Sequence, residues 1–169
     1  MTAPEPEALT IVEVPAGQRE AYGALLKLAD DSETAVAGYR DRGELFGLLD
    51  PGRGQPRGHV LAIPAAAPHT VELMSLAIVP EQQGRGLGKR LVLAVLERLR
   101  ARGWRRVIVA TATSSLDAIA FYQRLGFRMQ RIERDAFGPH TGYPADLQEH
   151  GIPVRDRVWL DRELTPAGP

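Results

Sequence analysis

The sequence contains no cysteine. This absence excludes disulfide bonds, a thiol nucleophile and metal sites with cysteine ligands. Lysine plus arginine and aspartate plus glutamate each number 21, so the formal net charge is zero and no broad basic surface for nucleic acid is expected. The histidines at positions 59, 69, 140 and 150 show no short ligand spacing, and we therefore expect no metal.

Long apolar runs are also missing, and no stretch approaches the roughly 18 residues of a membrane span. The first seven residues are acidic and rich in proline, without the basic-then-apolar pattern of a signal peptide. We expect a cytoplasmic protein that binds neither membrane nor nucleic acid. A length of 169 residues and 44% hydrophobic content favour a single domain over residues 1–169, with a core over about 9–164 and tails at 1–7 and 165–169.

Hydrophobic periodicity predicts a mixed α/β fold with about seven strands and four helices. The second to fourth strands follow one another closely, which favours an antiparallel meander. The fourth strand, the third helix and the fifth strand form a βαβ unit, so these two strands should be parallel. The strands are predicted at 9–14, 44–49, 59–63, 71–79, 106–110, 127–132 and 157–160, and the helices at 18–29, 32–39, 87–102 and 115–125.

A glycine-rich turn joins the fourth strand to the third helix. Glycines 84, 86 and 88 let the backbone approach a ligand, and the helix N-terminus favours an anion. Arg85, Lys89 and Arg90 add positive charge, so the turn is typical of a pyrophosphate cradle. A P-loop is excluded because Arg90 stands where serine or threonine is needed, and a dinucleotide fingerprint fails because its third glycine would be Lys89 or Leu91. The pattern Q-x-x-G-x-G fits, from Gln83 to Gly88.

A second motif follows the fifth strand. Ser115, Ala118, Phe121-Tyr122 and Gly126-Phe127 match N-x-x-A-x-x-[FL]-Y-x-x-x-G-F, with serine in place of the usual asparagine. The two motifs, in this order and at this spacing, resemble the GNAT N-acetyltransferase superfamily over about residues 9–164. The C-terminal part resembles a bacterial subgroup with undefined acceptors. The resemblance implies a mixed central sheet with splayed fourth and fifth strands, acetyl-CoA as cosubstrate, direct acetyl transfer to a primary amine and a homodimer.

The same resemblance implies the cofactor-binding residues. The backbone of Ile78 and Val79 should pair with the pantetheine amides, and Thr113 and Ser115 should also contact the pantetheine arm. Tyr122 should supply a proton or hydrogen bond to the departing thiolate. The pyrophosphate should be held by Gln83, Gly84, Arg85, Gly86, Leu87, Gly88 and Lys89.

An alkylamine has a pKa near 10, so a general base should assist its attack. Glu72, six residues before Ile78, matches the base of some family members; His69 and a water relay are the alternatives. The chain over 135–153 is predicted to be a long loop, and four of its residues are candidates to line the acceptor pocket: Asp135, His140, Tyr143 and Asp146.

A small-molecule amine is the expected acceptor. The first alternative is a protein or peptide N-terminus or lysine, which a cluster of acidic residues along the acceptor groove would favour. The second alternative is a non-catalytic acyl-CoA sensor, which would bind the cofactor without turnover. The sequence does not distinguish acetyl from longer acyl groups.

Overall fold

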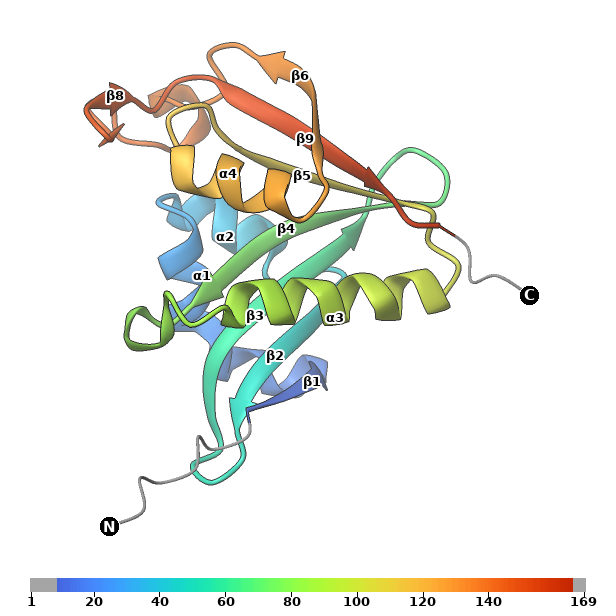
Figure 1. Cartoon of the computed structure of the whole chain (residues 1–169). Helices are drawn as coiled ribbons and strands as arrows, with labels where there is room; N and C mark the ends of the chain where they lie inside the picture. The colour runs from blue at the N-terminus through green and yellow to red at the C-terminus, as the bar shows by residue number, and fades with distance from the viewer. Residues whose placement is uncertain (1–8, 166–169) are drawn as a thin grey trace.

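A computed structural model describes residues 9–165, and it contains a seven-stranded sheet with helices on both faces and a separate two-stranded sheet (Figure 1). The predicted α/β fold is confirmed; the expected tails lie outside the described residues, apart from Thr165. No described helix is long and apolar enough to cross a membrane. The order of the large sheet is β1-β2-β3-β4-β5-β9-β6, from β1 (Thr10–Val14), β2 (Glu44–Asp50), β3 (Gln55–Pro64), β4 (Thr70–Ile78), β5 (Arg106–Ala112), β6 (Arg128–Glu133) and β9 (Arg157–Glu163).

The helices divide the core into two clusters. The first cluster lies between the sheet and the helices α3 (Leu87–Ala101) and α4 (Leu116–Arg124). The second lies on the other face, beneath the 3-10 helix η1 (Ala16–Tyr22) and the helices α1 (Gly23–Ala29) and α2 (Glu33–Tyr39). The predicted helix over 18–29 is therefore wrong in its first part, because the chain takes the tighter 3-10 form up to Tyr22.

Strands β2 to β4 form the predicted antiparallel meander. Strand β3 begins at Gln55, four residues before the predicted start. The sequence prediction missed this because Pro56 and Gly58 usually mark a turn. The pairing shifts register here, with Leu48 opposite Gly58 and Leu49 opposite Pro56, and such irregularities are where a sheet tolerates proline.

Helix α3 makes the predicted crossover between parallel strands. Leu91, Val95 and Leu99 are fully or almost fully buried along one face, and Gly103 follows the helix with φ 89°. The opposite side of the helix is fastened to the first strand, since Arg90 and Arg98 donate to the carbonyl groups of Leu9 and Ile11. Arg90 is thus occupied away from the glycine turn, contrary to the sequence expectation.

The parallel strands β4 and β5 pair over three residues and then diverge. Thr70 to Glu72 lie opposite Arg106 to Ile108, and the register contains no further pair between these strands in the described chain. Strand β4 also bulges, because Leu73 and Ser75 pair with consecutive residues of β3 and Met74 has no partner. Figure 1 shows α4 beside the gap that opens between the two strands.

The loop before β9 has more structure than predicted. It contains a short 3-10 helix, η3 (Pro139–Thr141), and a hairpin of two-residue strands, β7 (Gln148–Glu149) and β8 (Ile152–Pro153). We call residues 135–156 the late loop. Such short strands leave no periodic signal in a sequence, and the turn residues Gly142, Pro144 and Gly151 dominate the pattern.

Candidate active site

Three adjoining cavities follow the gap between β4 and β5. The glycine-loop groove, about 920 Å³, is lined by the glycine turn, the end of β4 and α4. The central cavity, about 370 Å³, shares Leu76, Asp117, Ala118 and Tyr122 with that groove. The acidic chamber, about 290 Å³, lies beyond and shares six lining residues with the central cavity: Ala29, Met74, Ala110, Thr111, Ser115 and Glu149.

The glycine turn presents free backbone N–H groups to the groove. Gly84 and Gly86 both have φ 74°, and Gly86 caps α3 in the left-handed conformation, which favours glycine. A Cβ atom added at either glycine would meet open space, so the absence of side chains serves access rather than internal packing. Since the first N–H groups of a helix lack intrahelical partners and carry partial positive charge, this turn fits an anionic ligand.

The predicted phosphate-binding residues gather at this turn with two exceptions. Gln83, Gly84, Gly86, Leu87, Gly88 and Lys89 line the groove. Arg85 is exposed and is not a lining residue; its guanidinium lies 3.4 Å from Oε1 of Gln82. Arg90 is the other exception, since it is bound to Leu9.

The backbone expected to contact pantetheine is partly occupied. The carbonyl oxygen of Ile78, a groove residue, accepts a hydrogen bond of 2.8 Å from Nε2 of Gln83. The Val79 N–H donates to the carbonyl of Arg57, and its own carbonyl accepts from the Gln82 N–H. Pairing of Val79 with a ligand would therefore require these bonds to rearrange, whereas Ile78 needs only the movement of one side chain.

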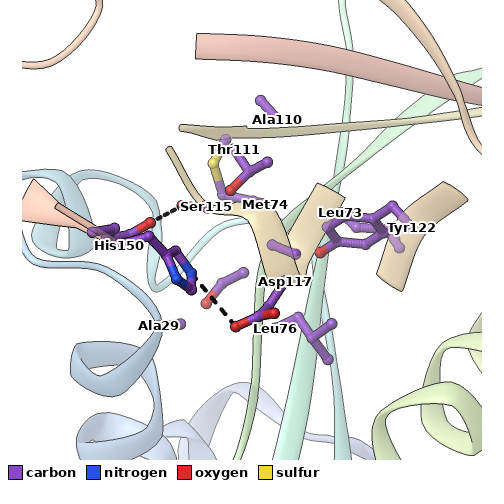
Figure 2. Close-up of a pocket in the computed structure, with 13 residues that line it drawn as sticks. Ala29, Leu73, Met74, Leu76, Ala110, Thr111, Ser115, Asp117, Tyr122 and His150 are labelled. Atoms are coloured by element: carbon purple, nitrogen blue, oxygen red, sulfur yellow. Dashed lines mark hydrogen bonds and ion pairs between the residues drawn. The ribbon is translucent and has the colours of Figure 1, made fainter. Parts of the chain in front are cut away.

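Tyr122 lies where the groove and the central cavity meet. Its ring is 8% exposed and packs edge to face against Phe121 and Phe127. Figure 2 shows its hydroxyl on the side of the ring that faces the other labelled pocket residues. The hydroxyl has no hydrogen-bond partner among the described residues, and burial raises its pKa to about 12. It is thus a proton-bearing, unengaged donor at neutral pH.

Ser115 immediately precedes α4 and is its N-cap residue. Neither serine side chain of the pair 114–115 makes a capping hydrogen bond, and the Ser114 hydroxyl is buried without a partner. Ser115 instead donates to the carboxylate of Glu149 in the late loop. Next to it, His150 lies 3.5 Å from Asp117 in an ion-pair geometry (Figure 2). Thr113 lines none of the three cavities, and its N–H donates to the carbonyl of Asp156.

Glu72 and His69, the two candidate bases, lie in different surroundings. Glu72 is half-buried and lines the acidic chamber. Its pKa is raised, chiefly by burial, against the opposing effect of Arg157 and Arg42. His69 is exposed, lies before β4 with φ 51°, and is not a lining residue of the three cavities.

A hydrogen bond between two buried polar side chains holds one lining residue of the central cavity. His59 on β3 is fully buried, and its Nε2 shares a 2.7 Å hydrogen bond with Oγ of Ser75, a residue of the cavity lining. Burial lowers the pKa of His59 to about 3, so the ring is neutral at physiological pH. No sequence pattern indicates this pair, because the two residues are 16 positions apart on neighbouring strands.

Of the four late-loop candidates, only Tyr143 lines the acidic chamber. Asp135 pairs with Arg155, His140 shares a hydrogen bond with the Asp135 carbonyl, and Asp146 is exposed. Four charged lining residues, from three separate segments, were not predicted from the sequence: Asp30, Asp31, Glu149 and Arg157. Asp31 directly precedes Ser32, which caps α2 by accepting from the Ala35 N–H.

Similar proteins of known family agree with this site geometry. The Acetyltransferase (GNAT) family matches residues 9–127, so the chain belongs to that family and is an acetyltransferase. A relative named "Uncharacterized N-acetyltransferase YvbK", from Bacillus subtilis, is 36% identical over 140 residues, which is 83% of this chain and 87% of that one.

Two solved structures are similar over most of the chain. A Bacillus subtilis acetyltransferase in complex with CoA has a TM-score of 0.81 and 34% identity, covering 93% of this chain and 99% of that one. A GNAT family acetyltransferase from Elizabethkingia anophelis with acetyl-CoA bound has a TM-score of 0.83 and 28% identity, covering 94% of this chain and all of the other.

Proposed function

We propose that this protein transfers an acetyl group from acetyl-CoA directly to a primary amine of a small molecule. The observation that carries the proposal is the position of Tyr122, on the boundary between the glycine-loop groove and the central cavity. The solved relatives that contain CoA or acetyl-CoA support the same cosubstrate here.

The groove suits the cosubstrate in charge and shape. The N–H groups from Gly84 to Lys89 would hold the pyrophosphate, with the Lys89 ammonium adding charge. The pantetheine arm would extend along β4 past Ile78 toward Leu76, where the strand has no β5 neighbour. An extended ligand can bind such an edge as an added strand would.

In the reaction, the amine attacks the thioester carbonyl and CoA leaves as a thiolate. Tyr122 would donate a hydrogen bond to the thiolate sulfur. Its pKa of about 12 lies well above the roughly 8.5 of a cysteine-like thiol, so complete proton transfer would be uphill and the hydrogen bond itself is the stabilising interaction.

Glu72 would accept the proton of the incoming amine, directly or through one water. Burial raises the pKa of its carboxyl from the ordinary value, which makes the carboxylate a better base. His69 has a weaker claim because it is outside the cavity lining.

The closed late loop favours a small acceptor over a protein segment. Tyr143 of the late loop donates a hydrogen bond to Asp30, and Glu149 of the late loop accepts one from Ser115. Two hydrogen bonds therefore attach the loop to other segments that line the acidic chamber. Acidic residues do line this chamber, as expected for a lysine acceptor, but these attachments leave it as a small cavity rather than a peptide groove.

The test is thiol release from acetyl-CoA across polyamines, aminoglycosides, amino acids and short peptides, with a control lacking acceptor. Release that depends on a small amine supports the proposal, and release with peptides alone replaces it with the protein-modifying alternative. Acetyl-CoA binding by calorimetry without turnover on any acceptor would favour the sensor, and no binding would overturn the assignment.

A further inference from the structure

The acidic chamber carries more negative charge than its own residues neutralise. Four carboxylates, those of Asp30, Asp31, Glu72 and Glu149, line a cavity of about 290 Å³. Arg157 is the only cationic side chain in that lining. Its guanidinium is shared, since Nη1 lies 3.3 Å from Oε2 of Glu133 while its charge also lowers the pKa of Glu72.

Asp30 is held in place by neutral donors. Its Oδ1 accepts from the Ser32 N–H at 2.9 Å and from the Tyr143 hydroxyl at 2.9 Å, and its Oδ2 accepts from the Tyr39 hydroxyl at 3.2 Å. These bonds fix the carboxylate without cancelling its charge. Burial, together with the neighbouring carboxylate of Asp30, raises the pKa of both tyrosines, so both remain hydroxyl donors.

The neighbouring negative charges also affect the pKa of Asp31. Its pKa is raised by burial and then by the charges of Glu149 and Asp30. No described residue forms a hydrogen bond or ion pair with its carboxylate. Asp31 is exposed and Asp30 and Glu149 are partly buried, so these like charges repel one another across partly solvated space, and a cation that binds between them relieves the repulsion.

The reacting amine gives its proton to Glu72 before it attacks, so the neutral nitrogen no longer compensates the charges of Asp30, Asp31 and Glu149 in the reacting complex. The compensating charge must therefore belong to a second group on the same acceptor. The other walls are apolar or aromatic and suit a short alkyl chain: Phe137, Tyr143, Leu147, Val154 and Trp159.

We infer that the acceptor is a small diamine, whose second, protonated amine binds Asp30 and Asp31 while the first is acetylated. This inference rests on the proposed function, because it assigns the acidic chamber to the acceptor. The six lining residues shared with the central cavity place the chamber directly beside the position of Tyr122.

The test compares matched acceptors: putrescine, n-butylamine, an aminoalcohol of the same length and a lysine peptide with blocked termini. The inference predicts that kcat/KM for putrescine exceeds that for n-butylamine by at least about tenfold, and that this preference falls as ionic strength rises. Equal values for the two amines, or a peptide preferred over putrescine, would overturn it while leaving acetyl transfer intact.

Two variants locate the second charge. Asp31→Asn removes a carboxylate that no described residue bonds to, and Asp30→Asn removes the fixed one; each should lower the putrescine preference by roughly tenfold. Asp146→Asn, an equal charge change on the exposed part of the late loop, should leave the preference unchanged. A preference that is insensitive to both Asp30 and Asp31 would refute the assigned site.

A binding measurement separates this inference from the proposed function. Calorimetry of putrescine with the CoA-loaded protein should show binding that Asp31→Asn weakens by roughly tenfold. Such binding without acetyl transfer would sustain the chamber's specificity and refute the reaction. Transfer to monoamines without putrescine binding would sustain acetyl transfer and refute the diamine site.

Discussion

The Tyr143 hydroxyl donates a 2.9 Å hydrogen bond to Asp30, across 113 positions of the chain. This bond joins the late loop to the end of α1, on the opposite side of the acidic chamber. The edge-to-face contact between Tyr143 and Phe137, with ring centroids 4.9 Å apart, extends the attachment along the loop. The chamber is thus assembled from segments at both ends of the described chain.

Replacing Tyr122 by phenylalanine should lower kcat by roughly 10²-fold and change the KM for acetyl-CoA much less. The ring and its contacts with Phe121 and Phe127 stay, and only the donor to the thiolate is lost. Steady-state kinetics with varied acetyl-CoA measure both constants. Unchanged turnover would remove Tyr122 from the reaction.

Replacing Glu72 by glutamine should depress activity most at pH values above the raised pKa of Glu72 and well below that of the amine, where the amine arrives protonated and the wild type still has an ionised base. The wild-type rate should itself decline as pH falls through the raised pKa of Glu72, because protonation removes the base. The variant should approach the wild type as pH rises toward the pKa of the amine. A loss that is uniform from pH 6 to about 9.5 would instead indicate a positioning role.

Alanine at Gly84 should raise the KM for acetyl-CoA, because its Cβ would enter the open space beside the N–H groups that we propose to bind phosphate. The positive φ of 74° should also cost about 1 kcal/mol of folding free energy. Gly54→Ala is the matched control, since Gly54 has φ 63° and open surroundings in a turn away from the groove. Equal effects of both variants on KM would count against a phosphate site.

The buried His59 should make stability depend on pH. Its pKa is about 3 when folded and 6.5 when free, so the unfolded chain takes up the proton first and stability falls as pH drops below 6.5. The expected loss between pH 7.5 and 5 is about 2 kcal/mol. Urea unfolding of the wild type and of His59→Gln should differ by this pH-dependent amount.

His69→Gln, a change at an exposed histidine, is the control and should follow the wild type. If His59→Gln has the same pH dependence as the wild type, then His59 is not the group responsible.

The sequence predicted the parts of the fold that depend on local pattern. Helix α3 and the parallel pairing of β4 and β5 follow from an apolar stripe and a short βαβ connection, and both are confirmed. Residues 55–58 were misjudged because proline and glycine at a sheet irregularity look like proline and glycine in a turn. The 3-10 start of the first helix was missed because its apolar spacing also fits an α-helix.

The residues of the glycine-loop groove could be predicted from the sequence, and most of those of the acidic chamber could not. A glycine turn is contiguous in sequence, so Gln83 to Lys89 could be found by motif. The acidic chamber depends on contacts between distant positions, such as Ser115 with Glu149, which no spacing rule reveals.

The narrow junction of β4 and β5 has a consequence for the protein's motion. The three residue pairs between β4 and β5 join two halves of the sheet. Beyond Glu72 and Ile108, the edges of the two strands that face each other have no ladder, although β4 stays paired with β3 and β5 with β9. The amides on these open edges should exchange faster than amides in a ladder. A cosubstrate bound along β4, as proposed, would take the place of the absent strand and slow that exchange, and hydrogen–deuterium exchange would record the change.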